Sequence, residues 1–273
     1  MKITDTNVIK NFCKMANDGW LQGWHERNGG NLSYRMNDDE INEVTAYINA
    51  SSQSTPIGTS VPGLAGDYFI VTGSGKFFSN VIDAPEDNIC IIRIDESGDT
   101  YQKLWGLASG GRPTSELPTH LMNHEVKKAT TNGAHRVIYH AHPANVIALT
   151  FVLPLDSKVF SRELWETMTE CPIIFPSGVG VVRWMVPGGR EIAVESAKLM
   201  ETYDAVIWAH HGLFCSGDTM DNTFGLLHTI EKASEILVKI KSMAPKRLQT
   251  ITPQEFRDLA KAFGVSLPDD YLD

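Results

Sequence analysis

The first regular pattern of apolar positions along the chain is that of an amphipathic helix. The positions that recur at its three- and four-residue spacing are Val8, Ile9, Phe12, Met15, Ala16 and Trp20. The pattern ends at the polar loop 26–31, and strands are expected at residues 32–36 and 68–72. Residues 37–66 are polar and rich in Ser, Gly, Asn and Pro. We expect an irregular insertion there rather than a domain linker, because a strand pattern resumes at once.

Strand and helix patterns alternate through the rest of the chain. The expected elements are a β-hairpin at 89–95 and 100–105, a helix at 115–129, a strand at 136–142 that feeds a short helix through Leu153, a strand at 180–184, a helix at 191–203, a strand at 205–214 and a helix at 219–243. A last helix starts at the capping box of Thr252 and Glu255 and ends at Gly264. With no internal repeat and no domain boundary, the pattern predicts a single three-layer α/β domain over residues 1–273. Its central sheet is expected to be mixed and mostly antiparallel, with helices on both faces.

Composition places the chain among ordinary globular proteins. Of its 273 residues, 42% are hydrophobic and 21% are charged, which excludes a disordered or collagen-like chain. The longest apolar stretch, 146–155, is far shorter than the roughly 20 residues of a membrane helix, and the first residues lack the basic-then-apolar pattern of a secretion signal. We therefore expect a cytoplasmic protein with no membrane partner.

Charge and cysteine spacing narrow the function further. The net charge of −9 predicts no nucleic-acid partner, because it repels a phosphate backbone and no basic stripe offsets it. An anionic substrate would have to be held by local backbone N–H groups and a few side chains. The four cysteines are widely spaced and form no Cys-x-x-Cys pair, so we expect them to be reduced and structural.

Histidines and one glutamate suggest a metal site. His140 and His142 are two residues apart in an expected strand, so their side chains project from the same face and can converge on one ion. A catalytic zinc site commonly has three protein ligands, and the pair His210-His211 in a second expected strand is the natural source of the third. Glu116, at a loop-to-helix junction, strengthens this interpretation. Taken alone, the His-x-His pair is equally compatible with a structural role. Glu116 alone would be better explained as a first-turn acid that complements the helix dipole.

Other motifs give weaker indications. His120 and His124 are spaced as helical metal ligands, but Leu121 stands where a zinc protease carries Glu, so we expect packing or supporting roles. The segment 73–76 does not complete a Walker A motif, and no dinucleotide fingerprint is present. Two glycine-rich loops, 28–31 and 73–75, remain as candidate anion-binding nests or as tight turns without a ligand.

Five short motifs follow one another along the chain. They are Asn28-Gly29-Gly30-Asn31, Thr72-Gly73-Ser74-Gly75-Lys76, Thr114-Ser115-Glu116, His140-Ala141-His142 and His211-Gly212. Each is weak alone, but in this order they resemble the class II sugar-phosphate aldolase family, which contains fuculose-phosphate aldolase, ribulose-phosphate 4-epimerase and the adducin head. The phrase Trp184-Met185-Val186-Pro187-Gly188 and the insertion at 37–66 resemble one branch of that family.

The resemblance implies an enzyme that cleaves a sugar phosphate with one Zn²⁺ per subunit. It assigns the zinc to His140, His142 and His211, the phosphate to Asn28, Gly30, Ser74, Gly75 and Ser115, the sugar to Asn31, and acid–base chemistry to Glu116. Glu170 would complete the site of a neighbouring subunit in a homotetramer whose sites lie at subunit interfaces. A 4-epimerase, an adducin-like structural module and an aldolase that forms a Schiff base at Lys76 are the alternatives.

Overall fold

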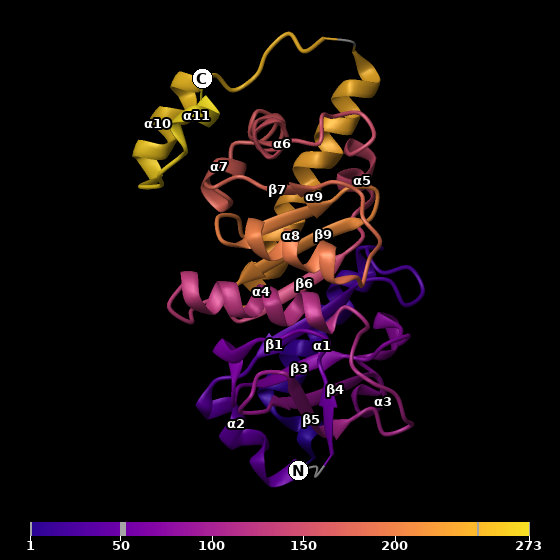
Figure 1. The fold of residues 1–273 in the computed structure, drawn as a ribbon. Helices are drawn as coiled ribbons and strands as arrows, with labels where there is room; N and C mark the ends of the chain where they lie inside the picture. Colours follow the sequence, from indigo (N-terminus) through magenta and orange to yellow (C-terminus); the bar gives the residue numbers. More distant parts are fainter. Residues whose placement is uncertain (1, 50–52, 245, 273) are drawn as a thin grey trace.

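One β-sheet runs through the whole molecule. The computed structural model describes residues 2–49, 53–244 and 246–272. Within them the strands are β1 (Asn31–Arg35), β2 (Ser54–Pro56), β3 (Tyr68–Thr72), β4 (Ile89–Ile94), β5 (Thr100–Gly106), β6 (Val137–Ala141), β7 (Gly180–Val182), β8 (Ala205–Trp208) and β9 (Gly212–Gly217). Their order in the sheet is β2-β5-β4-β3-β1-β6-β9-β8-β7 (Figure 1). The pair β7 and β8 is parallel and the other described pairs are antiparallel, which confirms the expected mixed, mostly antiparallel sheet.

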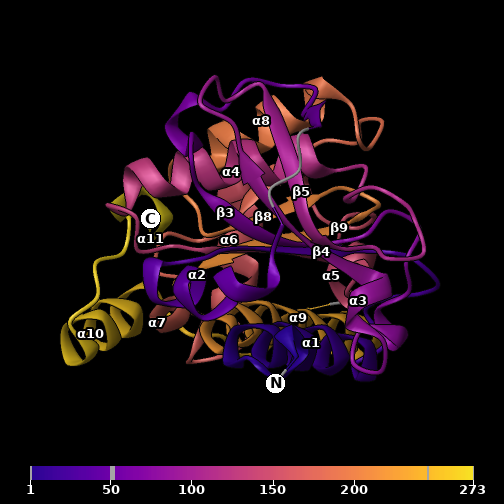
Figure 2. The same ribbon diagram turned by 90° about the horizontal axis from the view of Figure 1, so that it is seen from below.

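Helices cover both faces of this sheet. The longer ones are α1 (Asn7–Leu21), α4 (Leu117–Thr130), α6 (Ser157–Trp165), α8 (Arg190–Met200), α9 (Met220–Met243) and α10 (Pro253–Phe263). The shorter ones are α2 (Asp38–Val44), α3 (Pro85–Asn88), α5 (Ala144–Leu149), α7 (Cys171–Ile174) and α11 (Asp269–Leu272), with 3₁₀ turns at Ile3–Asp5, Thr45–Tyr47, Pro62–Leu64 and Phe78–Asn80. Helices α4 and α8 pack together on one face, and α1 packs with α9 on the other (Figure 2). The expected three layers are therefore present.

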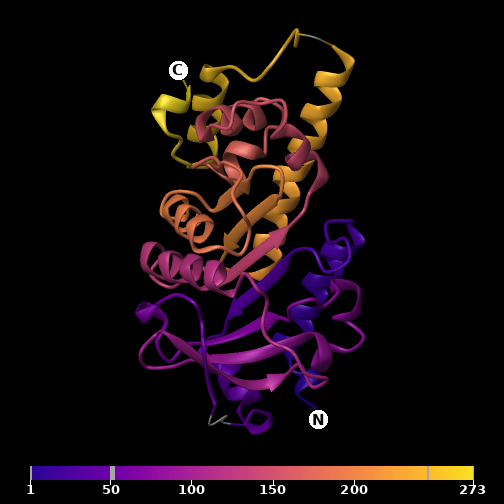
Figure 3. The same ribbon diagram turned by 45° about the vertical axis from the view of Figure 1, so that its right-hand side comes forward.

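The two parts of the chain form opposite ends of the sheet. Strands from the N-terminal part form one end, and the later strands form the other (Figure 3). The two parts join where β1 pairs with β6, with Asn31 opposite His140. This junction brings residues more than 100 positions apart into one register, and the candidate site residues lie beside it.

The C-terminal helix follows its sequence signals. The Thr252 hydroxyl accepts the N–H of Glu255, and the Glu255 carboxylate accepts the N–H of Thr252, as a capping box requires. Gly264 ends the helix with φ +68°, a left-handed conformation that favours glycine. Phe256 is buried and packs its ring against Trp165, which anchors α10 to α6.

The single strand expected at 205–214 is wrong. The chain forms β8, turns at residues 209–211 and returns as β9, antiparallel to β8. His210 lies in the turn with φ +60°, which is uncommon for a residue other than glycine. Its backbone N–H donates to the Thr150 hydroxyl at 3.0 Å, and this contact helps to hold the unusual conformation. The apolar residues on both sides of the turn concealed it from the sequence pattern.

The segment 37–66 is more regular than the sequence indicates. It contains α2, which Asn37 caps by accepting the N–H of Glu40 at 2.8 Å, and the edge strand β2. Residues 50–52 of this segment lie outside the described residues. The sequence pattern also missed α6 and α7, and it started α4 two residues too early, at 115 instead of Leu117.

The four cysteines agree with the expectation of reduced, structural residues. Cys13, Cys90, Cys171 and Cys215 are all buried, and none forms a disulfide within the part of the chain that the structure describes. Across the same residues, none of the helices has both the length and the apolar character needed to span a membrane.

Candidate active site

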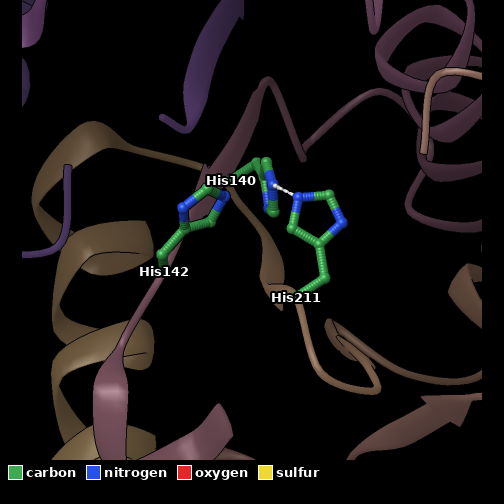
Figure 4. A group of neighbouring side chains, drawn as sticks. All are labelled: His140, His142 and His211. Carbon is green, nitrogen blue, oxygen red and sulfur yellow. Dashed lines mark hydrogen bonds between the residues drawn. The ribbon is translucent and has the colours of Figure 1, made fainter. Parts of the chain in front are cut away.

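Three histidines converge at the end of β6. His140 lies in the strand and His142 directly follows it, while His211 comes from the turn between β8 and β9 (Figure 4). One ring nitrogen of each histidine lies within 4.8 Å of those of the other two, and the Nε2 atoms of His140 and His211 are 3.4 Å apart. The structure thus brings together the three residues that the sequence nominates as metal ligands.

Strand pairing explains this convergence. Strands β6 and β9 pair with Ala141 opposite Leu213, so the turn that precedes β9 comes back beside the end of β6. The approach is very close, because a Cβ atom on Gly212 would lie 2.4 Å from the carbonyl oxygen of Ala141. Glycine at 212 therefore allows His211 to reach His140 and His142 at the end of β6. His210 points elsewhere, with its Nδ1 3.1 Å from the Thr150 hydroxyl.

His140 and His142 are each oriented by a contact at the Nδ1 atom of the ring. Nδ1 of His140 lies 3.2 Å from the backbone carbonyl of Leu213, and Nδ1 of His142 lies 2.8 Å from the Glu26 carboxylate. Such contacts fix the ring of a metal-binding histidine and leave Nε2 free to bind the ion. Among the described residues, Nε2 of His142 is buried without a hydrogen-bond partner, as expected of a nitrogen whose partner is a metal.

The protonation of these rings suits a metal. Burial lowers the pKa of His140 well below its usual value, and burial together with the nearby His142 lowers the pKa of His211 to about 4. Both rings are therefore neutral at pH 7 and present a lone pair. Three converging imidazole nitrogens fit a divalent transition metal with one position left for substrate.

Glu116 lies beside this group. Pro118 occupies the first turn of α4, and Glu116 precedes the helix as its N-cap residue, largely buried. Its carboxylate accepts a hydrogen bond of 2.9 Å from the side-chain amide of Asn31 and lies 3.8 Å from Nε2 of His140. Burial raises the pKa of Glu116, while the bond from Asn31 opposes the shift. A carboxyl group with a raised pKa next to a metal site can both give and take a proton.

A cavity of about 200 Å³ opens in front of the histidines and Glu116. Its lining consists of Asn28, Gly29, Gly30, Asn31, Gly73, Ser74, Gly75, Thr114, Ser115, Glu116, His140, His142, Pro187 and His211. All six residues that the sequence nominates for phosphate or sugar binding therefore face one space with the candidate metal ligands. Their individual roles stay predictions.

Backbone contacts bring the second glycine-rich loop to the cavity. Gly73 forms an isolated bridge with Pro113, and the N–H of Ser74 donates to the carbonyl of Arg112 at 2.9 Å. The N–H of Thr114 donates to the carbonyl of Thr72 at the same distance. These contacts hold segments 72–75 and 112–116 side by side. Ser74 from one segment and Ser115 from the other consequently line the same cavity.

Sequence reasoning missed the residue that supports the first glycine-rich loop. His25 is buried, stacks on Phe78 with ring centroids 3.7 Å apart, and lies 2.7 Å from the Tyr139 hydroxyl. Its Nδ1 contacts the carbonyl of Gly29 at 3.0 Å and so fixes the loop. His25 and Tyr139 are too far apart in the sequence for a local motif to link them, and the same holds for Glu26 and His142.

Glu170 and Lys76 lie outside the cavity of their own chain. Glu170 is exposed at the start of α7 and is absent from the described cavity lining. Lys76 is half-buried, its amine donates to the Ser109 hydroxyl at 3.2 Å, and it is absent from the described lining of the cavity that contains the histidines. A larger hollow of about 850 Å³ lies near α1 and contains none of the candidate site residues. Size therefore does not identify the functional cavity, whereas the chemistry of the lining does.

Comparison with known proteins agrees with this geometry. Residues 10–238 match the family described as Class II Aldolase and Adducin N-terminal domain. Because the match covers most of the chain, the protein belongs to this family.

Named relatives are similar over nearly the whole chain. A protein of Mannheimia succiniciproducens is 49% identical over 270 residues, which cover 99% of each chain, and one of Shigella boydii serotype 4 is 46% identical over 97% of this chain and 96% of its own. Both are named rhamnulose-1-phosphate aldolase. The sugar-phosphate aldolase from Thermotoga maritima superposes with a TM-score of 0.75 at 28% identity, covering 88% of this chain and 97% of that one.

The metal site yields a test with a matched pair of neighbouring histidines. His211→Ala should remove most of the bound divalent metal, because it deletes one of three converging nitrogens, whereas His210→Ala should leave the metal content close to that of the wild type. Elemental analysis of the purified proteins measures the metal per chain. Equal metal loss in both variants would contradict the assignment of His211.

Proposed function

We propose that this protein is a zinc-dependent aldolase that reversibly cleaves L-rhamnulose 1-phosphate to dihydroxyacetone phosphate and L-lactaldehyde, as a step in rhamnose degradation. The observation that carries the proposal is the meeting of three histidines, one glutamate and two glycine-rich loops in a single cavity. The choice of substrate rests on the relatives, which carry that name at 46–49% identity over nearly the whole chain. The resemblance of Trp184-Met185-Val186-Pro187-Gly188 to the same branch supports it.

The costly species in this reaction is the enediolate of dihydroxyacetone phosphate, which forms when the C3–C4 bond breaks. His140, His142 and His211 would hold the zinc, which when bound supplies a Lewis acid that stabilises this negative charge. In cleavage, the proton leaves the C4 hydroxyl, C4 becomes the aldehyde carbon of lactaldehyde, and Glu116 protonates C3. In condensation, Glu116 removes the same proton, as microscopic reversibility requires.

The glycine-rich loops would hold the phosphate group. Backbone N–H groups of Gly30 and Gly75, at φ +74° and +73°, belong to turns that can form anion nests. The side chains of Asn28, Ser74 and Ser115 would add hydrogen bonds, and Asn31 would position the sugar. A local arrangement of this kind is needed because the net charge of the protein is −9. Binding the phosphate away from the reacting carbons keeps C3 in register with Glu116.

The proposal also includes a cytoplasmic homotetramer in which Glu170 of one subunit serves the site of its neighbour. The position of Glu170 supports this arrangement, because its side chain is exposed at the start of α7 and lies outside the cavity of its own chain. In the neighbouring site, it would take the proton from the C4 hydroxyl. Four buried, reduced cysteines suit a reducing compartment.

The overall reaction is tested by following the release of L-lactaldehyde from L-rhamnulose 1-phosphate with and without a chelator. The wild-type protein should release the aldehyde, lose this activity on metal removal and regain it with zinc. Full activity of metal-free protein would exclude the zinc mechanism. An epimerised ketose phosphate without free lactaldehyde would identify a 4-epimerase instead, and borohydride trapping of the substrate on the protein would identify a Schiff-base enzyme.

Two substitutions should separate proton transfer from phosphate binding. Glu116→Gln should slow proton exchange at C3 of dihydroxyacetone phosphate by about 10²-fold or more, with a smaller effect on the affinity for inorganic phosphate. Ser74→Ala should weaken the binding of the sugar phosphate and of inorganic phosphate together. Unchanged exchange in Glu116→Gln would remove this residue from its role. Unchanged phosphate affinity in Ser74→Ala would do the same for Ser74.

Mixed oligomers test the role of Glu170. Chains with Glu116→Ala and chains with Glu170→Ala should each be poorly active alone. When the two are co-expressed, about a quarter of the interfaces in a cyclic assembly combine the intact Glu116 of one chain with the intact Glu170 of the other, and up to about that fraction of wild-type turnover should return. A site built within one chain gains nothing from mixing. If mixed oligomers form and their activity stays at the level of the separate mutants, Glu170 does not act across subunits.

A further inference from the structure

A row of polar side chains lies buried behind Glu116. The Asn31 amide that donates to Glu116 is in turn hydrogen-bonded through its Oδ1 atom to Nε2 of His120. Nδ1 of His120 lies 2.6 Å from the Ser33 hydroxyl, which lies 2.8 Å from Nε2 of His124. His120, Ser33 and His124 are completely inaccessible to solvent. The row therefore extends from the cavity into the protein interior.

The row forms where polar side chains on one face of β1 meet polar side chains on one face of α4. Asn31 and Ser33 are two residues apart in β1, so their side chains lie on the same face of the strand. His120 and His124 are four residues apart in α4 and lie on one face of the helix, in line with Glu116 just before it. The ring of His120 is also held edge-on against Phe214. Neither the sheet nor the helix needs these polar side chains in order to form. Their presence along the contact therefore indicates another role.

The positions of the hydrogen atoms follow from the Glu116 end. An ionised carboxylate only accepts, so while Glu116 is ionised Asn31 presents its N–H to Glu116 and its carbonyl oxygen to His120. Nε2 of His120 then carries the hydrogen. Burial lowers the pKa of His120 to about 3, so the ring is neutral and its Nδ1 accepts the hydrogen of Ser33.

The far end of the row agrees with this order. Because the single hydrogen of Ser33 is donated to His120, His124 must donate its own Nε2–H to the Ser33 oxygen. Nδ1 of the neutral His124 is then a bare acceptor. Among the described residues, this Nδ1 is a buried atom without a hydrogen-bond partner. An unsatisfied acceptor is less costly than an unsatisfied donor. In this arrangement, every hydrogen of the row is directed toward Glu116.

We propose that His120 is a positioning residue, which fixes the side-chain amide of Asn31 so that its N–H holds the Glu116 carboxylate in place for proton transfer at C3. Without the donor on His120, the Asn31 amide can rotate and turn its oxygen toward the carboxylate, which repels it. The inference rests on the proposed function, since it assigns His120 through the role of Glu116. The sequence suggests a packing or supporting role for His120, and the proposal assigns it the role of a hydrogen-bond donor that orients Asn31.

Two substitutions of His120 separate these roles. His120→Gln can place an amide nitrogen near the former Nε2 and keep the donor to Asn31, whereas His120→Asn reaches only as far as Nδ1 and loses that donor. Both variants lose the ring and its packing against Phe214. His120→Asn should slow C3 proton exchange and kcat by about 10- to 100-fold, as misplacement of a reacting group does, and His120→Gln should restore most of this loss. Metal content and the affinity for inorganic phosphate should match the wild type in both variants.

The outcomes are distinguishable. Absence of C3 exchange in the wild-type enzyme would refute the proposed function. Wild-type exchange with equal losses in both variants, or losses that follow metal content or thermal stability, would refute the positioning role alone.

Neutron diffraction of the deuterated wild-type protein supplies a test that requires no variant to fold. Deuterium on Nε2 of His120 and of His124 supports the row as derived. Deuterium on Nδ1 of His120 in place of Nε2 would overturn the proposal, because His120 could then donate nothing to Asn31.

Discussion

The pairing of β6 with its two neighbours is the constraint on which the site depends. On one side, β1 places Asn31 opposite His140, and on the other, β9 returns so closely that a Cβ at Gly212 would meet the backbone of β6. The first pairing supplies the amide that holds Glu116, and the second supplies His211. Backbone hydrogen bonds of the sheet thus bring together groups from three distant parts of the sequence, and the Asn31 amide connects them to Glu116 from a fourth. A shift of one residue in either pairing would turn these side chains to the opposite face.

This arrangement gathers polar groups in a place that water does not reach freely. Burial of unpaired polar groups is costly, and the protein meets the cost by supplying partners: Leu213 and Glu26 for the histidine rings, and Asn31 for Glu116. Burial also keeps the imidazoles of His140 and His211 neutral. A metal bound to the folded chain and not to the unfolded one would stabilise the fold by mass action. Such a metal would link stability and activity through the same three nitrogens.

The sequence predicted those features whose signals are local. Helix α1, the hairpin of β4 and β5, and the cap and end of α10 follow from periodicity and capping residues, and His140 and His142 converge because they are two residues apart at the end of β6. The turn at His210 was missed because a positive φ at a residue other than glycine leaves no local signal. The partners of Asn31, His142 and His25 were missed for another reason. They lie 85 or more positions away in the chain, and only the sheet brings them together.

The three histidines are proposed to form one metal centre beside a phosphate site. A crystal structure of the zinc-loaded protein with dihydroxyacetone phosphate, with anomalous diffraction measured at the zinc edge, tests it most directly. The account predicts one anomalous peak per chain, roughly 2.0–2.1 Å from a nitrogen of each of His140, His142 and His211, and the phosphate group between the loops at 28–31 and 73–75. A peak at His210 or elsewhere, or a phosphate bound outside this cavity, would contradict it.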